Sequence, residues 1–406
     1  MAETFAYRVR DRAGKLIEGA IEADNEGLVA VRLQAMGYVP ISIERKTASA
    51  LKKDINIPGF SNKVKVKDLA TFFRQLSTMI AAGLPVLRAL TVLEDQTEQK
   101  KLREVAGSVR SAIERGSSLS NSMNAHPEVF NRLVVSMVRA GETAGVLEAV
   151  LERLATTLER QHRLRARVKS AMTYPVAVGI MVVLILTGML LFVIPMFEGM
   201  YKELGGQLPA PTQFLIDLSG SFRSLWFVWL FGFGGGSVAL KKWKKTDVGR
   251  QKWDQFKLKV PIFGSLARKG AIARVSRTFA ALMKAGVPIL EALEIVGDSA
   301  GNEVVKAAFT QAQDDVSRGT GIATPLGQHK VIPPMMAQMI AVGEETGAVD
   351  EMLDKIADFY EHEVEATVDQ LTSLIEPLLI AVMGGTVGGM VIALYMPMFN
   401  IIKLIK

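Results

Sequence analysis

The chain has 406 residues and a formal net charge of +7, and 49% of its residues are hydrophobic. This apolar content is high for a purely soluble protein and indicates membrane segments beside soluble domains. Because the chain has no cysteine, disulfides, thiolate catalysis and cysteine-ligated zinc are excluded. The two densest basic clusters adjoin apolar stretches, where membrane topology explains them, so no nucleic-acid partner is expected.

Residues 1–45 predict a small N-terminal α/β module. Apolar residues alternate with polar ones from Phe5 to Val9, which is typical of a strand. The other expected elements are strands at residues 16–21 and 38–43 and a helix at residues 25–36. The first residues are charged rather than apolar, so we expect no cleavable signal peptide. Residues 46–62 are expected to form a linker.

Residues 63–172 predict a first cytoplasmic helical bundle. Apolar residues recur at spacings of three and four before Gly83, which places on one helix face Leu69, Phe72, Phe73, Leu76, Met79 and Ile80. In Gly83-Leu84-Pro85 the glycine can adopt a left-handed C-cap and the proline can occupy a first helical turn, so a corner between two helices is expected. Further helices are expected at residues 97–115, 127–140 and 146–171.

The stretch from Pro175 to Phe197 contains no charged residue. At ~1.5 Å per residue it would reach roughly 35 Å as a helix, enough to cross a hydrocarbon core. It follows a basic cluster typical of the cytoplasmic side, formed by Arg160, Arg163, Arg165, Arg167 and Lys169. We therefore expect transmembrane helices at residues 173–197, 222–240 and 373–402, a short periplasmic loop at 198–221 and a periplasmic tail at 403–406.

The second of these expected spans is short and rich in glycine. It is followed at once by Lys241, Lys242, Lys244 and Lys245, which would return the chain to the cytoplasm.

The chain repeats itself at an offset of 202 or 203 residues, which indicates a duplicated unit. Tyr174-Pro175 before the first span corresponds to Glu376-Pro377 before the last one. Arg74, Gly83 and Pro85 recur as Arg277, Gly286 and Pro288, and the turn of Gly141, Glu142 and Gly145 recurs as Gly343, Glu344 and Gly347. A one-residue deletion near Pro333 explains the change of offset. Residues 241–372 are thus expected to form a second cytoplasmic helical bundle.

Two interpretations of the Gly-Glu turns are open. The glycines can break one helix while the glutamate caps the next with its carboxylate. Alternatively, the turns belong to a docking surface or a carboxylate site. No histidine or second acid stands at ligand spacing, so no metal site is expected.

The last span carries two further candidate features. Glu376 is an ionisable group at the mouth of the span, where it either faces the interface or helps to bind a membrane partner. Two overlapping Gly-x-x-x-Gly pairs, which include Gly384 and Gly388, indicate tight helix packing within the chain or in an oligomer.

The chain contains no P-loop, no dinucleotide fingerprint and no nucleophile elbow. No catalytic residue and no cofactor are expected, and the residues indicate a non-catalytic membrane scaffold.

These features resemble the inner-membrane platform family of type IV pilus and type II secretion machines, the PilC/GspF proteins. The resemblance covers nearly the whole chain. It depends on Arg74-Gln75-Leu76, both Gly-x-Pro corners, both Gly-Glu turns, Thr173-Tyr174-Pro175 and Leu374-Ile375-Glu376-Pro377. Two further stretches, Leu208 to Thr212 and Tyr395 to Phe399, look more like the pilus-assembly members.

The resemblance implies a mainly α, multi-pass protein of the bacterial inner membrane, with three transmembrane helices, a cytoplasmic N-terminus and a periplasmic C-terminus. It implies a platform, not an enzyme, that couples a cytoplasmic hexameric ATPase to the insertion and extraction of pilins. Inner-membrane alignment proteins, the lipid bilayer and further copies of the chain are the other implied partners.

In this interpretation the bundles contact the ATPase, while Glu376 and the glycine-rich span contact pilin or a second copy. A type II secretion platform is an alternative. A membrane transporter or channel subunit is an alternative from another class.

Overall fold

The structure is a computed structural model that describes residues 3–10, 16–23, 26–45, 63–196, 199 and 210–404. The expected linker at residues 46–62 lies outside the described residues, and so do most of residues 198–209 and the last two residues of the expected tail. The chain divides into two compact units, Met1–Asn62 and Lys63–Lys406, which are described separately.

The first unit contains a three-stranded antiparallel sheet and one helix. Its elements are β1 (Glu3–Arg10), β2 (Leu16–Ala23), α1 (Glu26–Ala35) and β3 (Val39–Arg45), with the strand order β2-β1-β3. The pairing of β1 with β3 shifts by one residue between Arg8 and Val9, where Pro40 lies opposite Val9. A bulge suits this place because proline cannot donate a ladder hydrogen bond. Val29 and Leu33 of α1 form a small core.

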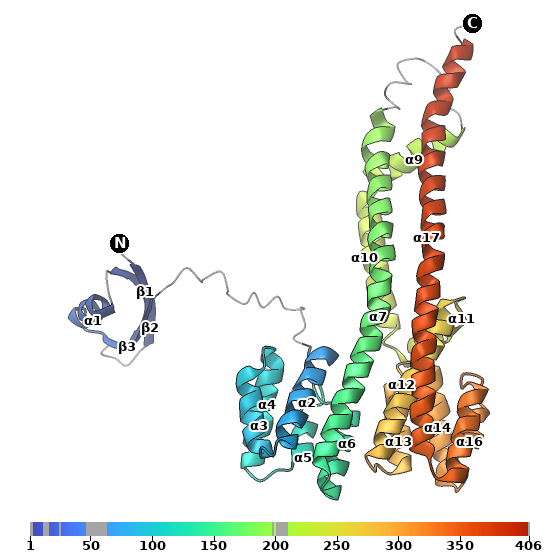
Figure 1. The fold of residues 1–406 in the computed structure, drawn as a ribbon. Coiled ribbons are helices and arrows are strands. Elements are labelled where there is room, and N and C mark those ends of the chain that lie inside the picture. Colours follow the sequence, from blue (N-terminus) through green and yellow to red (C-terminus); the bar gives the residue numbers. More distant parts are fainter. Residues whose placement is uncertain are drawn as a thin grey trace. The chain divides into compact units, whose positions relative to one another are not determined.

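The second unit contains two helical bundles built from corresponding helices (Figure 1). The first comprises α2 (Val66–Ala81), α3 (Val86–Gln96), α4 (Lys100–Glu114), α5 (Leu119–Asn124), α6 (Arg132–Ala144) and the first part of α7 (Leu147–Gly188). The second comprises α12 (Phe263–Lys284), α13 (Ile289–Ser299), α14 (Glu303–Ser317), α15 (Ala323–Gly327), α16 (Pro334–Thr346) and the first part of α17 (Val349–Leu404). It is preceded by α11 (Asp247–Lys259).

Several corresponding helices begin at the offsets that the sequence predicts. The starts of α3 and α13, at Val86 and Ile289, are 203 residues apart, whereas those of α6 and α16, at Arg132 and Pro334, are 202 apart. The change of offset therefore falls between the starts of α13 and α16, a range that includes the expected place near Pro333. The short helices α5 and α15 were not anticipated from the sequence.

The bundles share one apolar core. It is lined in the first bundle by Phe73 and Phe130, whose ring centroids are 6.0 Å apart, and in the second by Phe279 and Phe309, 6.4 Å apart. All four side chains are fully buried.

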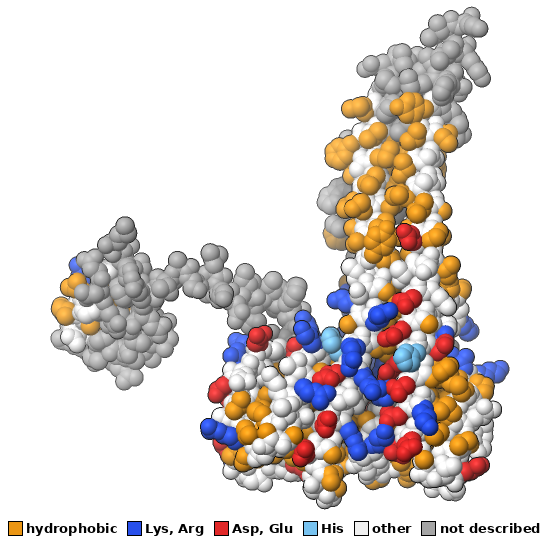
Figure 2. All heavy atoms as spheres, in the orientation of Figure 1, with side chains coloured by type: hydrophobic (Ala, Val, Ile, Leu, Met, Phe, Trp, Pro, Cys, Tyr) orange, Lys and Arg blue, Asp and Glu red, His pale blue; other side chains and the backbone are white. Residues whose placement is uncertain are grey.

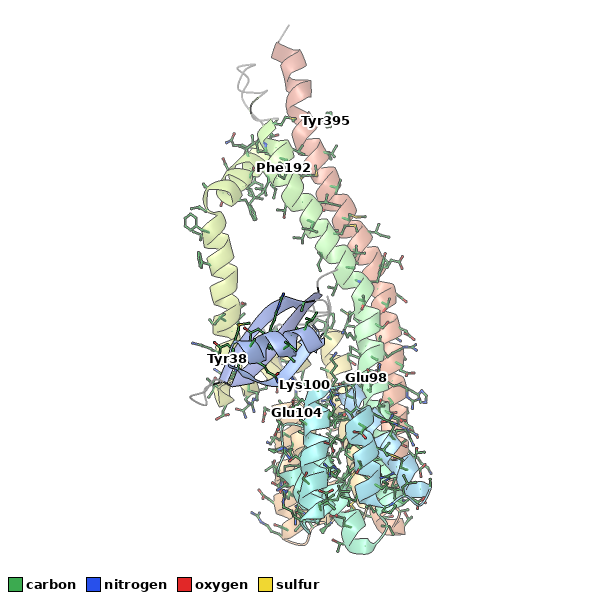
Figure 3. The ribbon with its side chains drawn as sticks, turned by 90° about the vertical axis from the view of Figure 1, so that its left-hand side faces the viewer. Tyr38, Glu98, Lys100, Glu104, Phe192 and Tyr395 are labelled. Carbon is green, nitrogen blue, oxygen red and sulfur yellow. The ribbon has the colours of Figure 1, made fainter. Side chains whose placement is uncertain are left out.

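Helices α7 and α17 leave the bundles and continue side by side as a stem (Figure 1). The sequence predicts a bundle helix that ends at residue 171 and spans that begin at residues 173 and 373, but α7 and α17 continue from the bundles through Pro175 and Pro377 without ending. Proline removes only one backbone donor, and helices in apolar surroundings tolerate it where neighbouring groups compensate. Phe192 and Tyr395 lie toward the far end of this stem, whereas Glu98, Lys100 and Glu104 belong to the first bundle (Figure 3).

The expected loop at residues 198–221 is wrong in its second half, because α9 (Ala210–Ser224) occupies residues 210–224. Three residues on one face of α9, Thr212, Ile216 and Ser219, are buried. Ser219 donates its hydroxyl to the carbonyl of Leu190, in the π-helical turn η2 (Met189–Val193) that follows α7.

That carbonyl has no donor in its own helix. The amide of Ile194 donates to the carbonyl of Met189 instead, and Pro195 has no N–H that could donate. Helix α9 therefore satisfies a backbone group that the π-turn leaves free.

The range of the second expected span, 222–240, does not coincide with a single helix. Helix α9 ends at Ser224 and α10 (Trp226–Trp243) begins after Leu225. The uncharged part of α10, up to Leu240, measures about 22 Å at ~1.5 Å per residue, shorter than a hydrocarbon core of about 30 Å.

Two helices of the described residues are long and apolar enough to cross a membrane. They lie within Leu147–Met196 and Val349–Ile392. Their apolar side chains face outward, as with Leu184 at 66% and Leu378 at 61% exposure. Figure 2 shows hydrophobic side chains over the stem and charged ones gathered over the bundles.

Candidate functional site

The two Gly-Glu turns hold the short helices in place. The carboxylate of Glu142, at the end of α6, accepts hydrogen bonds from the amides of Leu119, at 2.6 Å, and Ser120, at 3.0 Å. In the second bundle the carboxylate of Glu344 accepts hydrogen bonds in the same way from the amides of Ile322 and Ala323. These amides open α5 and α15, where unpaired N–H groups favour a carboxylate. The glutamates thus cap the short helices that precede them in the chain. Capping of the helix that follows was one of the two interpretations that the sequence left open.

The glycines of the same turns allow two helices to pack closely. A Cβ atom added to Gly141 would lie 3.0 Å from the Cβ of Val150, and one added to Gly343 would lie 2.9 Å from the Cα of Val349. Gly145 ends α6 with φ +68° and Gly347 ends α16 with φ +71°, a conformation that side chains disfavour.

In both Gly-x-Pro corners the glycine has the predicted left-handed conformation, but the proline precedes the helix instead of occupying its first turn. Gly83 has φ +83° and Gly286 has φ +79°, while Pro85 and Pro288 are the residues that precede α3 and α13. Both corners lie at the end of the bundles opposite the stem, as do the turns at Gly145 and Gly347 (Figure 1). We call this face, with its four duplicated turns, the distal end.

Arg74 and Arg277 each tie the first long helix of a bundle to its stem helix. Arg74 bonds both carboxylate oxygens of Glu159, at 2.7 and 2.8 Å. Arg277 bonds Asp354 at 2.9 Å, Glu361 at 3.0 Å and also Asp358.

The two arginines differ in burial, because the side chain of Arg74 is 38% exposed and that of Arg277 is 9% exposed. The second bundle therefore carries the stronger network.

These networks lower the pKa values of two acids. The hydrogen bond from Arg74 lowers the pKa of Glu159, although burial opposes the shift. Burial of Asp358 would raise its pKa, but the hydrogen bond and the charge of Arg277, with the charge of Arg160, lower it overall. Both carboxylates therefore stay ionised at neutral pH, and the stability that they add is lost as the pH falls through their lowered pKa values.

The acids of α17 that hold Arg277 were missed in the sequence analysis. Asp354, Asp358 and Glu361 follow at spacings of four and three, so they share one helix face. At an offset of 202 residues they correspond on α7 to Glu152, Thr156 and Glu159. The recurrence of this polar pattern in both copies is the signal that could have revealed the network.

Ion pairs join the two bundles. Arg160 on α7 bonds Asp358 on α17 at 2.7 Å, and Arg167 approaches Asp369 at 3.3 Å. Arg132 bonds Glu294 at 2.7 Å. Part of the basic cluster before the first span is thus occupied by acids of the second copy.

The predicted residues of the stem are mostly exposed. Tyr174, Glu376 and Pro377 are exposed, whereas Pro175 is buried. A Cβ atom added to Gly384 or Gly388 would meet no described atom within 4 Å. Packing of these glycines against another part of the chain is therefore not seen among the described residues.

The described residues contain no group of three or more histidine, aspartate or glutamate side chains arranged to hold a metal ion. The predicted residues form caps, close helix contacts and ion pairs. Together with the two apolar helices, they define the class of the protein, a helical protein with membrane-length helices that is built from two copies of one helical unit.

Comparison with known proteins identifies the family. A model described as "Type II secretion system (T2SS), protein F" matches residues 72–195 and 275–397, and one for the N-terminal domain of the same protein matches residues 1–44. The chain therefore belongs to the type II secretion system protein F family. The family and the two apolar helices together indicate an inner-membrane protein.

Three relatives match over nearly their whole length. "Type IV pilus assembly protein PilC" of Thermus thermophilus is 42% identical over 98% of both chains. The protein of the same name from Myxococcus xanthus is 39% identical over 98% of this chain and 94% of its own. "Type II secretion system protein F" of Vibrio cholerae is 34% identical over 99% of both.

We expect Glu142→Ala and Glu344→Ala to loosen α5 and α15 respectively. Losing a helix cap costs about 1 kcal/mol, which corresponds to a roughly fivefold rise in amide exchange. Hydrogen exchange of the purified protein, followed by mass spectrometry, measures the effect at residues 119–124 and 323–327. Glu345→Ala changes an exposed neighbour of Glu344 and is the control. Unchanged exchange in both short helices would rule out the capping role.

We expect Arg277→Gln to destabilise the protein more than Arg74→Gln. Removing the buried Arg277 takes the shared cation from three acids, although Lys284 and Arg160 still pair with two of them, Asp354 and Asp358, so the expected cost is about 2 kcal/mol. The more exposed Arg74 pair is worth about 1 kcal/mol or less. Thermal unfolding of the detergent-solubilised variants checks this order, and equal losses would contradict it.

Proposed function

We propose that this protein is the inner-membrane platform of a type IV pilus assembly machine. The observation that carries the proposal is the near-full-length similarity to two type IV pilus assembly proteins, at 39% and 42% identity. The type II secretion relative is 34% identical, which favours the pilus role over the secretion role. In this role the chain is a structural component and not an enzyme.

The proposed topology has three transmembrane helices, formed by the apolar parts of α7, α10 and α17. Lys241 and Lys242 in the last turn of α10, with the arginines before Pro175, favour a cytoplasmic position for both bundles. The end of α17 then lies in the periplasm. The shortness of α10 is compatible with a span because flanking lysines can extend their side chains to the interface.

The proposed mechanism uses the continuity of α7 and α17. Each helix begins at the distal end and runs into the stem without a break, so a displacement applied at the distal end moves the membrane part as well. A cytoplasmic hexameric ATPase would contact the distal end, which faces away from the membrane in this topology. The stem would pass the movement to pilins in the bilayer.

The stem offers a surface for these membrane partners. Glu376 is exposed on α17, and Gly384 and Gly388 have open space beside them. Small residues at this spacing allow another helix to approach closely. We assign this surface to a pilin helix or to a second copy of the chain, and inner-membrane alignment proteins would complete the assembly.

Purification of the tagged protein from its own cells in mild detergent tests the function. A platform should retain a hexameric assembly ATPase and pilins, which mass spectrometry would identify. Recovery of secretion-system components instead would favour the type II alternative. Recovery of another membrane complex, together with uptake of a small solute by vesicles that contain the protein, would support a transporter and overturn the proposal.

Two variants should separate the two contact surfaces. Leu87 and its counterpart Leu290 lie in the first turns of α3 and α13 at the distal end and are 37% and 38% exposed. Leu87→Asp with Leu290→Asp should release the ATPase and keep the pilins. Glu376→Gln with Gly388→Leu should release the pilins and keep the ATPase.

Each variant is the control for the other, and the melting temperature shows whether the change unfolds the protein. If folded forms of both variants retained every partner, the assignment of these surfaces would be wrong.

A further inference from the structure

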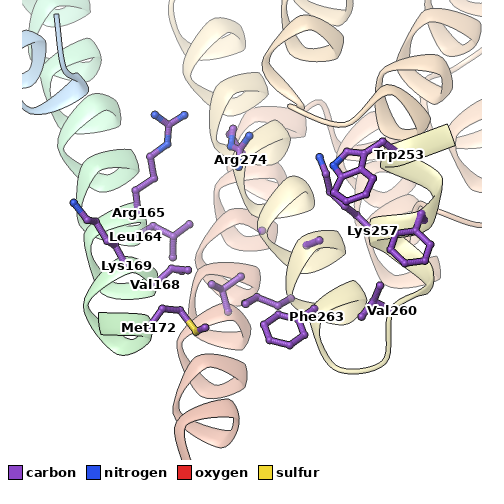
Figure 4. Close-up of a pocket in the computed structure, with 15 residues that line it drawn as sticks. Leu164, Arg165, Val168, Lys169, Met172, Trp253, Lys257, Val260, Phe263 and Arg274 are labelled. Atoms are coloured by element: carbon purple, nitrogen blue, oxygen red, sulfur yellow. The ribbon is translucent and has the colours of Figure 1, made fainter. Parts of the chain in front are cut away.

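A cavity of about 680 Å³ opens between α7, α11, α12 and α17 (Figure 4). Its wall on α7 includes Arg165, Val168, Lys169 and Met172, and Trp253 and Phe263 contribute from the opposite side. Met172 lies three residues before Pro175, where the apolar stretch begins. The cavity is therefore next to the place where the stem leaves the bundles.

Two arginines line this cavity, Arg165 and Arg274. Among the described residues neither forms an ion pair with a carboxylate, and no acid contributes to the pKa shift of Arg274. The guanidinium of Arg274 bonds only the carbonyl of Ala300, at 3.2 Å. Burial, and then the positive charge of Arg165, lower the pKa of Arg274. A largely buried guanidinium that also feels the charge of the more exposed Arg165 favours an anion near both cations.

The acids near the cavity are already paired. Asp254 bonds Lys257 at 2.6 Å, and Glu361 bonds Arg277 at 3.0 Å. Lys169 adds a further cation to the wall of the cavity. The ammonium of Lys244, from the end of α10, lies 3.4 Å from the ring centroid of Trp253. The cavity therefore has a surplus of positive charge.

The apolar and basic parts of the cavity are separated. Along α7, Arg165 lies further from the stem than Val168 and Met172, and Arg274 lies on the same level as Arg165 (Figure 4). Val260 and Phe263 lie opposite Met172, at the end nearer the stem. This order matches a phospholipid, whose phosphate would lie at the arginines and whose chains would extend toward the bilayer.

We propose that this cavity binds one anionic phospholipid from the leaflet beside the bundles. The phosphate would lie between Arg165 and Arg274, and the acyl chains would lie along Val168, Met172 and Phe263. Because the walls come from both copies of the duplicated unit, the bound lipid would hold the two bundles together at the membrane surface. The proposal depends on the stem being in the membrane, but not on the role in pilus assembly.

Trp253 provides a probe inside the cavity. The chain has four tryptophans, so changing the other three, Trp226, Trp229 and Trp243, to Phe leaves Trp253 as the only fluorophore. The full chain is placed in vesicles of phosphatidylethanolamine with a minor fraction of phosphatidylglycerol. In one sample the phosphatidylglycerol carries brominated acyl chains, which quench tryptophan. In the other sample an equal mole fraction of brominated phosphatidylethanolamine replaces it as the quencher.

We expect brominated phosphatidylglycerol to quench Trp253 more than brominated phosphatidylethanolamine does. Arg165→Gln with Arg274→Gln should reduce this preference at least about tenfold, because each cation near a lipid phosphate contributes about a factor of five to ten. Arg165→Gln with Lys169→Gln changes only exposed residues and gives a second test if the first variant does not fold.

Lys241→Gln with Lys242→Gln is the matched control, because it removes two charges at the membrane surface outside the cavity, and it should keep the preference. Equal quenching by the two lipids in the wild-type chain would overturn the proposal. So would loss of the preference in the control, which would indicate a diffuse attraction. If inorganic phosphate in the buffer abolished the preference, the site would take free phosphate and not a lipid. No pilus component is present, so the result is independent of the proposed function.

Discussion

Each of the helices α7 and α17 passes through two different environments along one continuous backbone. In their first parts they bury apolar residues in the bundle core, as Leu151 and Leu154 do on α7 and Leu353 and Ile356 do on α17. Further along, the apolar side chains face outward instead. A helix saturates its own backbone hydrogen bonds, so it is among the few structures that can make this transition without a break. The other helices of the bundles are arranged around these two.

The two copies share the same turns but differ in their charged residues. Both copies have a glutamate that caps a short helix and a glycine that lets two helices approach. Arg167 and Asp369, in contrast, occupy equivalent positions and bond each other. Two arginines facing each other at this point would repel. With an acid at one of the two equivalent positions, the residues attract each other and form a contact between the bundles.

The basic cluster before the first span illustrates how one sequence feature serves several purposes. Its high positive charge fits the positive-inside pattern. In the folded chain Arg160 and Arg167 are paired with acids of α17, whereas Arg165 and Lys169 line the cavity beside α12. Residues that look equivalent in the sequence therefore have different contacts, because they lie on different sides of α7.

By itself, the sequence determined the repeat, the helical character of the bundles, the Gly-x-Pro corners and the apolar stretches of the stem, because these depend on local spacing and on residues with special backbone conformations. It could not determine whether Pro175 and Pro377 end a helix, since that depends on the groups around them. The partners of Glu142 and Glu344 were equally inaccessible, because they lie more than 20 residues away. The acids that hold Arg277 left a repeated polar pattern in the sequence, but only the fold shows which cation they hold. Only the tertiary structure brings distant helices together, and it alone decided which charges are paired and which are left free to face a ligand.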